Sequence, residues 1–366
     1  MSLNVTALET KHLELGATMT DFAGWNMPLR YTSDREEHTA VRERAGMFDL
    51  SHMGQIRVEG PDAGAVLDYS LVNILSGMPI GRARYSLMVD QAGGIIDDLI
   101  VYRNDDTDFL VIANGANRLT VADELTSRSA AIEARVAIQD NTESRCLIAV
   151  QGPASLDILL SIIDEEDRAA VAELGYYRHG RYALAGVPIH LARTGYTGER
   201  GYEVMADANA AIQLWDIIAT AGEAHGLQPC GLSARDTLRL EAGMPLYGNE
   251  LSRDVTPAGA GQGRVVKLDH EFVGAQALRS HGDPATSLYG LVGEGRRAAR
   301  AGSLIRIDGE DVGEITSGVL SPTLGYPIAL ALLKPGIGEG QAVVADVRGK
   351  DQPMTVTALP FYQSNN

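Results

Sequence analysis

The sequence predicts an α+β fold with two related lobes and a small C-terminal β-barrel or sandwich. Strand-like runs follow one another across short turns and helical segments come after them, so the strand–helix–strand repeats of a doubly wound sheet are missing. The same order of strands and helices restarts near residue 176. Beyond residue 287 the pattern changes to short, regularly spaced strands with frequent Gly and Pro turns, which is typical of a small barrel.

The first lobe is expected over residues 1–150, exchanging segments with the second lobe. Helices are predicted over residues 36–44 and 61–74, the latter because Pro61 suits a first helical turn. A hairpin is predicted over residues 84–102, since two strand-like runs flank a turn that ends in two glycines. Further strands are predicted over residues 55–59, 109–113, 136–139 and 146–150.

Asp97 and Asp98 lie side by side in the second strand of this hairpin. Successive strand side chains point to opposite faces, so Asp98 shares a face with Ile96 and Ile100 while Asp97 lies on the other, also apolar, face. A buried carboxylate either finds partners or shifts its pKa. Each acid therefore either binds backbone N–H groups of a neighbouring loop or faces a ligand.

The second lobe is expected over residues 151–279. It carries a predicted helix over residues 208–225 and another that begins with Ser233 as its N-cap. Arg235 and Arg239 are four residues apart and share one face of that helix. They serve either ion pairs within the fold or, for Arg235 in the first turn, the carboxylate of a ligand.

The third domain is expected over residues 288–366, after a linker of Gly, Pro and Ser that ends at residue 287. Its strands are predicted over residues 288–292, 303–307, 313–316, 328–333, 342–347 and 354–359.

Composition narrows the range of partners. The 31 Lys and Arg residues against 48 Asp and Glu residues give a formal net charge of −17, which disfavours nucleic-acid binding. No apolar run reaches the roughly 18–20 residues of a membrane span, and the first residues lack the pattern of a signal peptide. Two cysteines cannot form a disulfide framework. These features predict a cytoplasmic protein without membrane or nucleic-acid partners.

His52 follows Asp49 and Ser51 and could serve as a base or a metal ligand. No second His or Cys stands at the spacing of a metal site, so no metal is expected. A histidine beside an acid and a serine is more often a hydrogen-bonded scaffold group, and that is the interpretation favoured for His52.

Seven motifs occur in an order that resembles the aminomethyltransferase (T-protein) family of the glycine cleavage system from about residue 8 to residue 362. They are Phe22-Ala23-Gly24-Trp25-Asn26-Met27-Pro28, Phe48-Asp49-Leu50-Ser51-His52-Met53-Gly54, Gly93-Gly94-Ile95-Ile96-Asp97-Asp98-Leu99, Val150-Gln151-Gly152-Pro153, Thr194-Gly195-Tyr196-Thr197-Gly198-Glu199, the run from Gly231 to Gly243, and Thr316-Ser317-Gly318 with Ser321-Pro322-Thr323-Leu324-Gly325. Each motif alone is weak, but all seven in order are specific.

The resemblance implies a three-lobed cloverleaf with tetrahydrofolate, a co-substrate, in a central channel. It also implies that an aminomethyl group moves from the lipoyl arm of the H-protein to tetrahydrofolate. The products are 5,10-methylenetetrahydrofolate, ammonia and the dihydrolipoyl H-protein, with no metal and no covalent enzyme intermediate.

The resemblance assigns the catalytic role to Asp98, whose carboxylate would hydrogen-bond the N10–H of the folate and stabilise developing positive charge. Residues expected around the folate are Tyr85, Tyr102, Asn114, Asn117, Tyr196, Glu203, Arg235 and Arg300. Glu203 matches the acid that binds the pterin edge, Arg235 the arginine on the folate side, and Arg300 the arginine near the channel mouth. Arg235 gives the anionic folate tail a cation in an otherwise acidic chain.

The sequence departs from the family pattern at two places. Arg264 stands where the family usually has an aromatic residue, commonly Trp, and the C-terminal run 360–363 matches only in its first half. Either change could alter the channel wall or the surface on which the H-protein docks.

Two other functions remain open on the sequence alone. A stand-alone tetrahydrofolate-dependent demethylase would use the same folate site, whereas the related oxidases carry a flavin domain and no Gly-x-Gly-x-x-Gly fingerprint begins this chain. A non-catalytic folate-binding scaffold for iron–sulfur assembly would carry a Lys-Gly-Cys-Tyr signature, which is absent.

Overall fold

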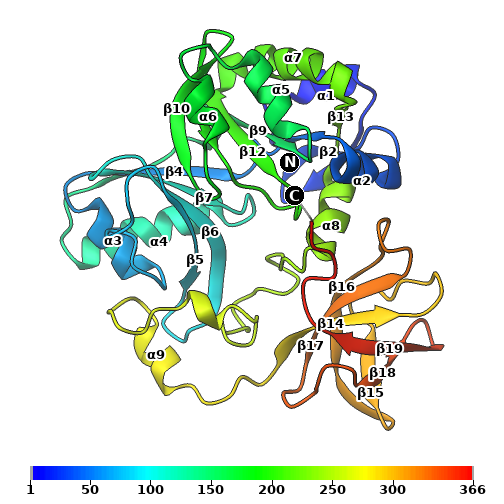
Figure 1. Cartoon of the computed structure of the whole chain (residues 1–366). Coiled ribbons are helices and arrows are strands. Elements are labelled where there is room, and N and C mark those ends of the chain that lie inside the picture. Colours follow the sequence, from blue (N-terminus) through cyan, green and yellow to red (C-terminus); the bar gives the residue numbers. More distant parts are fainter. Residues whose placement is uncertain (1–2, 365–366) are drawn as a thin grey trace.

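The computed structural model describes residues 3–364 and places two mixed lobes beside a C-terminal barrel (Figure 1). No helix in this range is long and apolar enough to cross a membrane. The elements follow the predicted α+β order, with a closed barrel at the end.

The first lobe is an antiparallel sheet with strand order β5-β6-β7-β4-β8. Its strands are β4 (Gly54–Glu59), β5 (Ala83–Val89), β6 (Ile95–Arg103), β7 (Asp108–Ala113) and β8 (Ala137–Asp140). Helices α3 (Ala63–Ser70) and α4 (Arg118–Ala131) pack on it over a core that includes Leu67, Phe109 and Leu125. The predicted hairpin is β5–β6, where Gly93 has a φ of +85° and the Asp90 side chain accepts from the backbone N–H groups of Ala92 and Gly94.

The second lobe is a six-stranded sheet with order β10-β11-β12-β9-β3-β13, antiparallel except for the parallel pair β3–β13. Its strands are β3 (Gly46–Asp49), β9 (Arg145–Gln151), β10 (His179–Leu184), β11 (Val187–Ala192), β12 (Gly201–Asp207) and β13 (Gln228–Pro229). The helices of this lobe are α1 (Glu9–Glu14), α5 (Ser155–Ile162), α6 (Arg168–Ala172) and α7 (Ala211–Gly222). Strand β3 and nearly all of β9 precede residue 151, so the second sheet takes strands from both sides of that position.

The two sheets meet through one buried cluster to which both contribute. Tyr102 and Ile112 come from the first sheet, Leu147 and Ala149 from the second, and Leu238 from helix α8 (Leu232–Glu241). Helix α2 (Asp34–Glu43) packs against α8, and a separate two-stranded hairpin, β1 (Thr18–Phe22) with β2 (Trp25–Arg30), lies next to them. Helix α8 is therefore the element around which both sheets and the hairpin are assembled.

The C-terminal barrel closes in the order β14-β17-β16-β15-β18-β19. Its strands are β14 (Ser287–Gly293), β15 (Leu304–Ile307), β16 (Glu310–Leu320), β17 (Pro327–Leu333), β18 (Ala342–Asp346) and β19 (Asp351–Thr357), and helix α9 (Ala275–Ser280) precedes them. Six predicted strands correspond to these six. Strand β16 is longer than predicted because a register shift between Ile315 and Ser317 lets the strand continue. Helix α8 contacts β16 and β17, so the barrel sits directly below it (Figure 1).

Two predicted helix ends are wrong. The helix predicted over residues 61–74 ends at Ser70, because Leu71 is extended and the Asp68 carboxylate accepts from the N–H groups of Leu75 and Ser76. Ser233 is not the N-cap of α8. Gly231 takes that position, and its N–H donates to Glu37 Oε2 at 2.8 Å, so a carboxylate from α2 replaces a local cap.

Candidate active site

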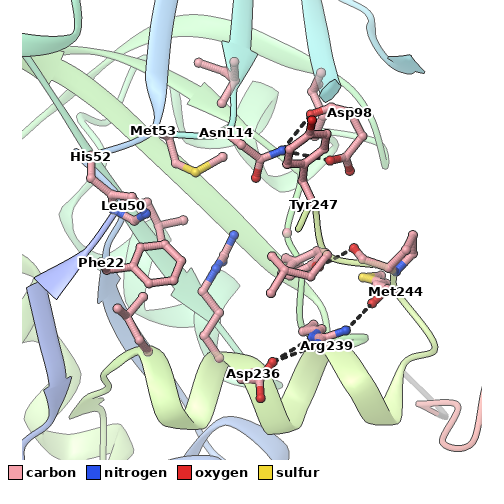
Figure 2. Close-up of a pocket in the computed structure, with 18 of the residues that line it drawn as sticks. Phe22, Leu50, His52, Met53, Asp98, Asn114, Asp236, Arg239, Met244 and Tyr247 are labelled. Carbon is pink, nitrogen blue, oxygen red and sulfur yellow. Dashed lines mark hydrogen bonds and ion pairs between the residues drawn. The ribbon is translucent and has the colours of Figure 1, made fainter. Parts of the chain in front are cut away.

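A cavity of about 630 Å³ lies where the two sheets, the β1–β2 hairpin and α8 meet. Strand β6 supplies Asp98 to its wall, β12 supplies Glu203, and α8 supplies Arg235. Figure 2 shows Asp98 and Asn114 on one side of this cavity and Phe22, Leu50 and His52 on the other, with α8 along the lower edge. The walls are a mixture of apolar side chains and a few polar groups, which is the usual make-up of a small-molecule site.

Asp98 is partly buried and directs its carboxylate to the cavity wall. The Tyr85 hydroxyl donates to its Oδ2 at 3.2 Å, and Asn114 Nδ2 donates to its Oδ1 at 2.8 Å. No cation among residues 3–364 lies within ion-pair distance of it. Neutral donors therefore orient the Asp98 carboxylate, and no described cation balances its charge.

Asp97 lies on the opposite face of β6 and is fully buried. Its carboxylate accepts from the backbone N–H and Nδ2 of Asn114 at 3.0 and 2.9 Å and from Nδ2 of Asn117 at 2.7 Å. Asp97 therefore has the structural role expected of a buried acid, because it binds and stabilises the turn that follows β7. Asp98 has the other expected position, because its side chain lines the cavity.

Burial raises the pKa of both carboxyl groups above the ordinary aspartate value. At Asp97 the charge of Asp98 raises the pKa further. At Asp98 the hydrogen bonds from Asn114 and Tyr85 lower the pKa and so partly offset the effect of burial. Because the charge of Asp98 raises the pKa of Asp97, the protonation of one acid affects that of the other. A raised carboxyl pKa at a cavity wall is a common property of catalytic acids and bases.

Glu203 is almost fully buried, and two hydroxyl groups orient its carboxylate. The Tyr102 hydroxyl donates to Oε2 at 3.2 Å, and the Thr194 hydroxyl donates to the same oxygen. Tyr102 itself is completely buried and does not line the cavity. It therefore positions Glu203 and does not face a ligand directly.

Arg235 projects from the first turn of α8, as predicted, and its guanidinium stacks on the ring of Tyr196 at 4.7 Å from the ring centroid. Tyr196 is held in turn by a hydrogen bond from its hydroxyl to the carbonyl of Pro245. Arg239, four residues further on, forms ion pairs with Asp236 and Glu250. Both arginines line the cavity, but the guanidinium of Arg239 is paired with two carboxylates, whereas that of Arg235 has no carboxylate partner within ion-pair distance among the described residues.

The structure brings together six of the nine predicted site residues on the cavity wall: Tyr85, Asp98, Asn114, Tyr196, Glu203 and Arg235. Tyr102 and Asn117 lie one layer behind, bonded to Glu203 and Asp97 respectively. Arg300 is in a different place. It is exposed, donates to the carbonyl of Gly318 at 3.0 Å, and lines a separate cavity of about 300 Å³ beside Arg296 and Asp34. The barrel strand β16 holds it away from Asp98.

The expectation that His52 is a hydrogen-bonded scaffold group is wrong. Asp49 is already occupied by His12 Nε2 at 2.9 Å, the Thr6 hydroxyl at 2.7 Å and the Ser51 N–H at 2.9 Å. His52 lines the cavity, and its Nδ1 is buried without a hydrogen-bond partner among the described residues.

Other cavity residues were missed by the sequence reasoning: Phe22, Leu50, Met53, Met244, Tyr247 and Asn249. Most lie in loops or at strand ends, where no periodicity marks a buried face. The one available signal was that Phe22, Leu50 and Met53 lie in two of the seven family motifs, at residues 22–28 and 48–54.

The two departures from the family pattern lie beside the cavity. Arg264 is in the short 3₁₀ turn Gly263–Val265 and does not line it, although its neighbour Gln262 does. Tyr362 and Gln363 line a third cavity of about 400 Å³, which shares Gly195 and Met244 with the first. The Tyr362 ring lies under the Arg42 guanidinium at 4.1 Å.

Comparison with known proteins identifies the family of the chain. Residues 8–270 match the GCVT N-terminal domain, and residues 287–363 match the glycine cleavage T-protein C-terminal barrel domain. An aminomethyltransferase from Streptomyces coelicolor is 52% identical over 99% of this chain and 98% of its own length, and one from Cutibacterium acnes is 50% identical over 99% of both. The crystal structure of the glycine cleavage system aminomethyltransferase T from Bartonella henselae has a TM-score of 0.90 at 32% identity and covers 99% of both chains.

Full-length coverage at about half identity, together with the matching three-part fold, shows that this chain belongs to the glycine cleavage T-protein family of aminomethyltransferases.

Proposed function

We propose that this enzyme transfers the aminomethyl carbon from the lipoyl arm of an H-protein to tetrahydrofolate. The products would be 5,10-methylenetetrahydrofolate, ammonia and the dihydrolipoyl H-protein. The observation that carries the proposal is the position of Asp98, an acid without a cationic partner on the wall of a 630 Å³ cavity that also contains Glu203 and Arg235.

The cavity suits tetrahydrofolate in size and in donor set. Cavities of about 300–1,000 Å³ hold ligands of this size. A pterin carries an amino-pyrimidinone edge that one carboxylate binds through two hydrogen bonds, and Glu203 is held for that task by Tyr102 and Thr194. Arg235 would bind the anionic glutamate tail, for which the acidic chain has few other cations in this cavity.

Asp98 would act where the carbon is transferred. Its carboxylate can accept the N10–H of the folate and stabilise positive charge on the carbon as ammonia leaves. Tyr85 and Asn114 fix the direction of the two carboxylate oxygens, so no reorientation is needed during the reaction. The apolar side chains of Leu99 and Ile100 on the same wall keep the local dielectric low and strengthen this interaction.

The lipoylated H-protein would be the partner, with its lipoyl arm reaching the same cavity. The two cysteines, Cys146 and Cys230, are free and buried, which suits a reducing compartment, and we place the reaction in the cytoplasm.

A direct test uses the purified protein, lipoylated H-protein carrying the aminomethyl group, and tetrahydrofolate, and follows the formation of methylenetetrahydrofolate. We expect turnover that requires all three components. Parallel reactions with sulfonium or N-methyl donors test the demethylase alternative. Turnover with those donors and none with the H-protein would contradict the proposal.

A further inference from the structure

His52 is the one histidine on the wall of the main cavity, as far as residues 3–364 show, and nothing assigned above uses it. Its side chain is 2% exposed. Figure 2 shows it beside Leu50 and Phe22, on the side of the cavity away from Asp98.

The ring is held by packing and not by hydrogen bonds. The Phe22 ring meets it edge-on, with centroids 5.5 Å apart and an interplanar angle of 90°. Gly115 makes room for it on the other side, because a Cβ there would lie 3.1 Å from His52 Cδ2 and 2.7 Å from the His52 carbonyl oxygen. Packing on both sides therefore restricts the orientation of the ring.

The two ring nitrogens of His52 differ. Nδ1 is sealed from solvent and has no partner among the described residues. Nε2 is the nitrogen left to reach the cavity. Buried polar atoms are almost always satisfied, and an orphaned N–H is rarer than an orphaned acceptor. The tautomer with the proton on Nε2 is therefore favoured, and it presents an N–H donor to the cavity.

The charge state follows from the same surroundings. Burial lowers the pKa of His52 to about 4, the charge of Asp49 opposes that shift, and the guanidinium of Arg235 adds to it. The ring is neutral at neutral pH and offers a hydrogen bond without a positive charge.

Resting on the proposed function, we propose that the Nε2–H of His52 donates a hydrogen bond to the sulfur of the aminomethylated lipoyl arm. Figure 2 shows Phe22, Leu50 and Met53 close to His52, and these apolar side chains suit an aliphatic, sulfur-bearing chain. The groups that complement a folate, Asp98, Glu203 and Arg235, come from β6, β12 and α8. His52 thus binds the donor while those residues bind the acceptor.

The chemistry balances without a proton from His52. The carbon–sulfur bond breaks with its electron pair on sulfur, and the carbon–nitrogen bond breaks as ammonia leaves. Both folate nitrogens form bonds to the carbon, and the two protons that they lose end on sulfur and on ammonia. The hydrogen bond from His52 becomes stronger as negative charge develops on sulfur, so it lowers the barrier to the step.

Paired substitutions test which nitrogen matters. The amide nitrogen of Gln in His52→Gln can reach the position of Nε2, whereas that of Asn in His52→Asn falls near Nδ1. We expect kcat/KM for the aminomethylated H-protein to fall about tenfold in His52→Asn and to be largely restored in His52→Gln. The Kd for tetrahydrofolate, measured by titration, should stay within about twofold in both variants.

His270→Gln is the matched control. His270 also has a buried, unpartnered Nδ1, but its Nε2 bonds the carbonyl oxygen of Asp68 and it does not line the main cavity. We expect this variant to keep wild-type kcat/KM. An equal loss in the Gln and Asn variants of His52, wild-type kinetics in His52→Asn, or a loss that appears in the tetrahydrofolate Kd would each overturn the proposal.

A measurement on the wild-type protein guards against variants that do not fold. The ¹⁵N shifts of His52 should show the Nε2–H tautomer, and the Nε2 signal should move when aminomethylated H-protein is added and stay in place with tetrahydrofolate alone. A proton on Nδ1, or no response to the H-protein, contradicts the proposal. If the wild-type enzyme shows no turnover with the H-protein at all, the proposed function itself fails and this inference falls with it.

Discussion

Two regions of the molecule bury several charges, and they treat them in opposite ways. The first, here called the barrel junction, consists of His38, Arg42, Arg239, Glu241 and Glu250, where α2 and α8 meet the barrel. The second is the cavity wall that carries Asp98 and Glu203.

In the barrel junction every carboxylate has a cationic group close by. Glu241 lies 2.9 Å from Arg42 and 3.1 Å from His38, and Glu250 lies 3.0 Å from Arg239. Burial alone would raise the pKa of Glu241. The pKa is instead lowered to about 2 by the hydrogen bond and charge of His38, the hydrogen bond from Ser321 and the charge of Arg42.

On the cavity wall, Asp98 and Glu203 have only neutral donors. Asp98 is bonded to Tyr85 and Asn114, and Glu203 to Tyr102 and Thr194. Burial consequently prevails at Asp98, whose pKa rises. The comparison shows that burial of an acid does not by itself mark a functional group. A buried acid that the fold has left without a cation, at a cavity, does.

The largest expected effect is on catalysis by Asp98. Asp98→Asn keeps the shape and the hydrogen bond from Asn114 but removes the negative charge, so aminomethyl transfer should fall by about 10²-fold or more. The Kd for tetrahydrofolate should change by only a few-fold. Steady-state turnover with aminomethylated H-protein, together with a folate titration, checks both expectations, and near-wild-type turnover would remove Asp98 from the mechanism.

The barrel junction should respond in stability instead of catalysis. Glu241→Gln removes the carboxylate that lies 2.9 Å from Arg42 and accepts from the Ser321 hydroxyl and the Thr323 N–H. Arg42 then has Glu199 as its remaining carboxylate partner, so the free energy of unfolding should fall by about 3 kcal/mol. Asp98→Asn should leave stability unchanged or raise it, because it removes a charge that burial disfavours. Denaturant unfolding of both variants measures the contrast, and stability losses of equal size would erase the distinction between the two regions.

Much of the fold could be predicted from the sequence because the relevant patterns are local. The β5–β6 hairpin depends on two strand-like runs around an Asp and two glycines, and the six barrel strands depend on regular turn residues. The N-cap of α8 could not be predicted in this way. It depends on Glu37, nearly two hundred residues away, whose carboxylate accepts from the N–H of Gly231.

In the site, too, the local patterns could be predicted and the long-range contacts could not. Alternation along β6 places Asp97 and Asp98 on opposite faces, and that was predictable, but their different partners come from Asn114 and Asn117 in a later loop. Arg300 does not line the main cavity. It bonds the carbonyl of Gly318 and lines a separate cavity, so its expected place near the folate channel stays a prediction. His52 shows a limit of the sequence reasoning, since its sequence neighbour Asp49 is already occupied by three other donors.

A medium effect is expected at Glu203. Glu203→Ala removes a carboxylate that Tyr102 and Thr194 hold in place, so tetrahydrofolate binding should weaken by about tenfold or more. Tyr102→Phe is the matched variant, since it removes only one hydrogen bond to that carboxylate and should weaken binding by about threefold. Titration of folate into both variants tests this order, and an unchanged Kd in Glu203→Ala would contradict the role of Glu203.

The smallest effect is expected at Arg235. Arg235→Ala should weaken the binding of polyglutamylated tetrahydrofolate about fivefold more than that of a tail-less pterin, if the guanidinium binds the anionic tail as proposed. The difference should shrink as salt is added. Equal losses for both ligands would instead assign Arg235 a purely structural role, next to the ring of Tyr196.

The central claim is that Asp98 acts as a carboxylate kept without a cation at the cavity wall, and the pH dependence of kcat/KM tests it most directly. Since burial raises the pKa of Asp98, the carboxylate form is lost as the pH falls through a value above the ordinary 3.8, while the low pKa of Glu241 preserves the barrel junction through the same range. We predict an acid limb above pH 4 in the wild-type enzyme that is absent from the residual activity of Asp98→Asn. An acid limb that persists unchanged in the variant would contradict the account.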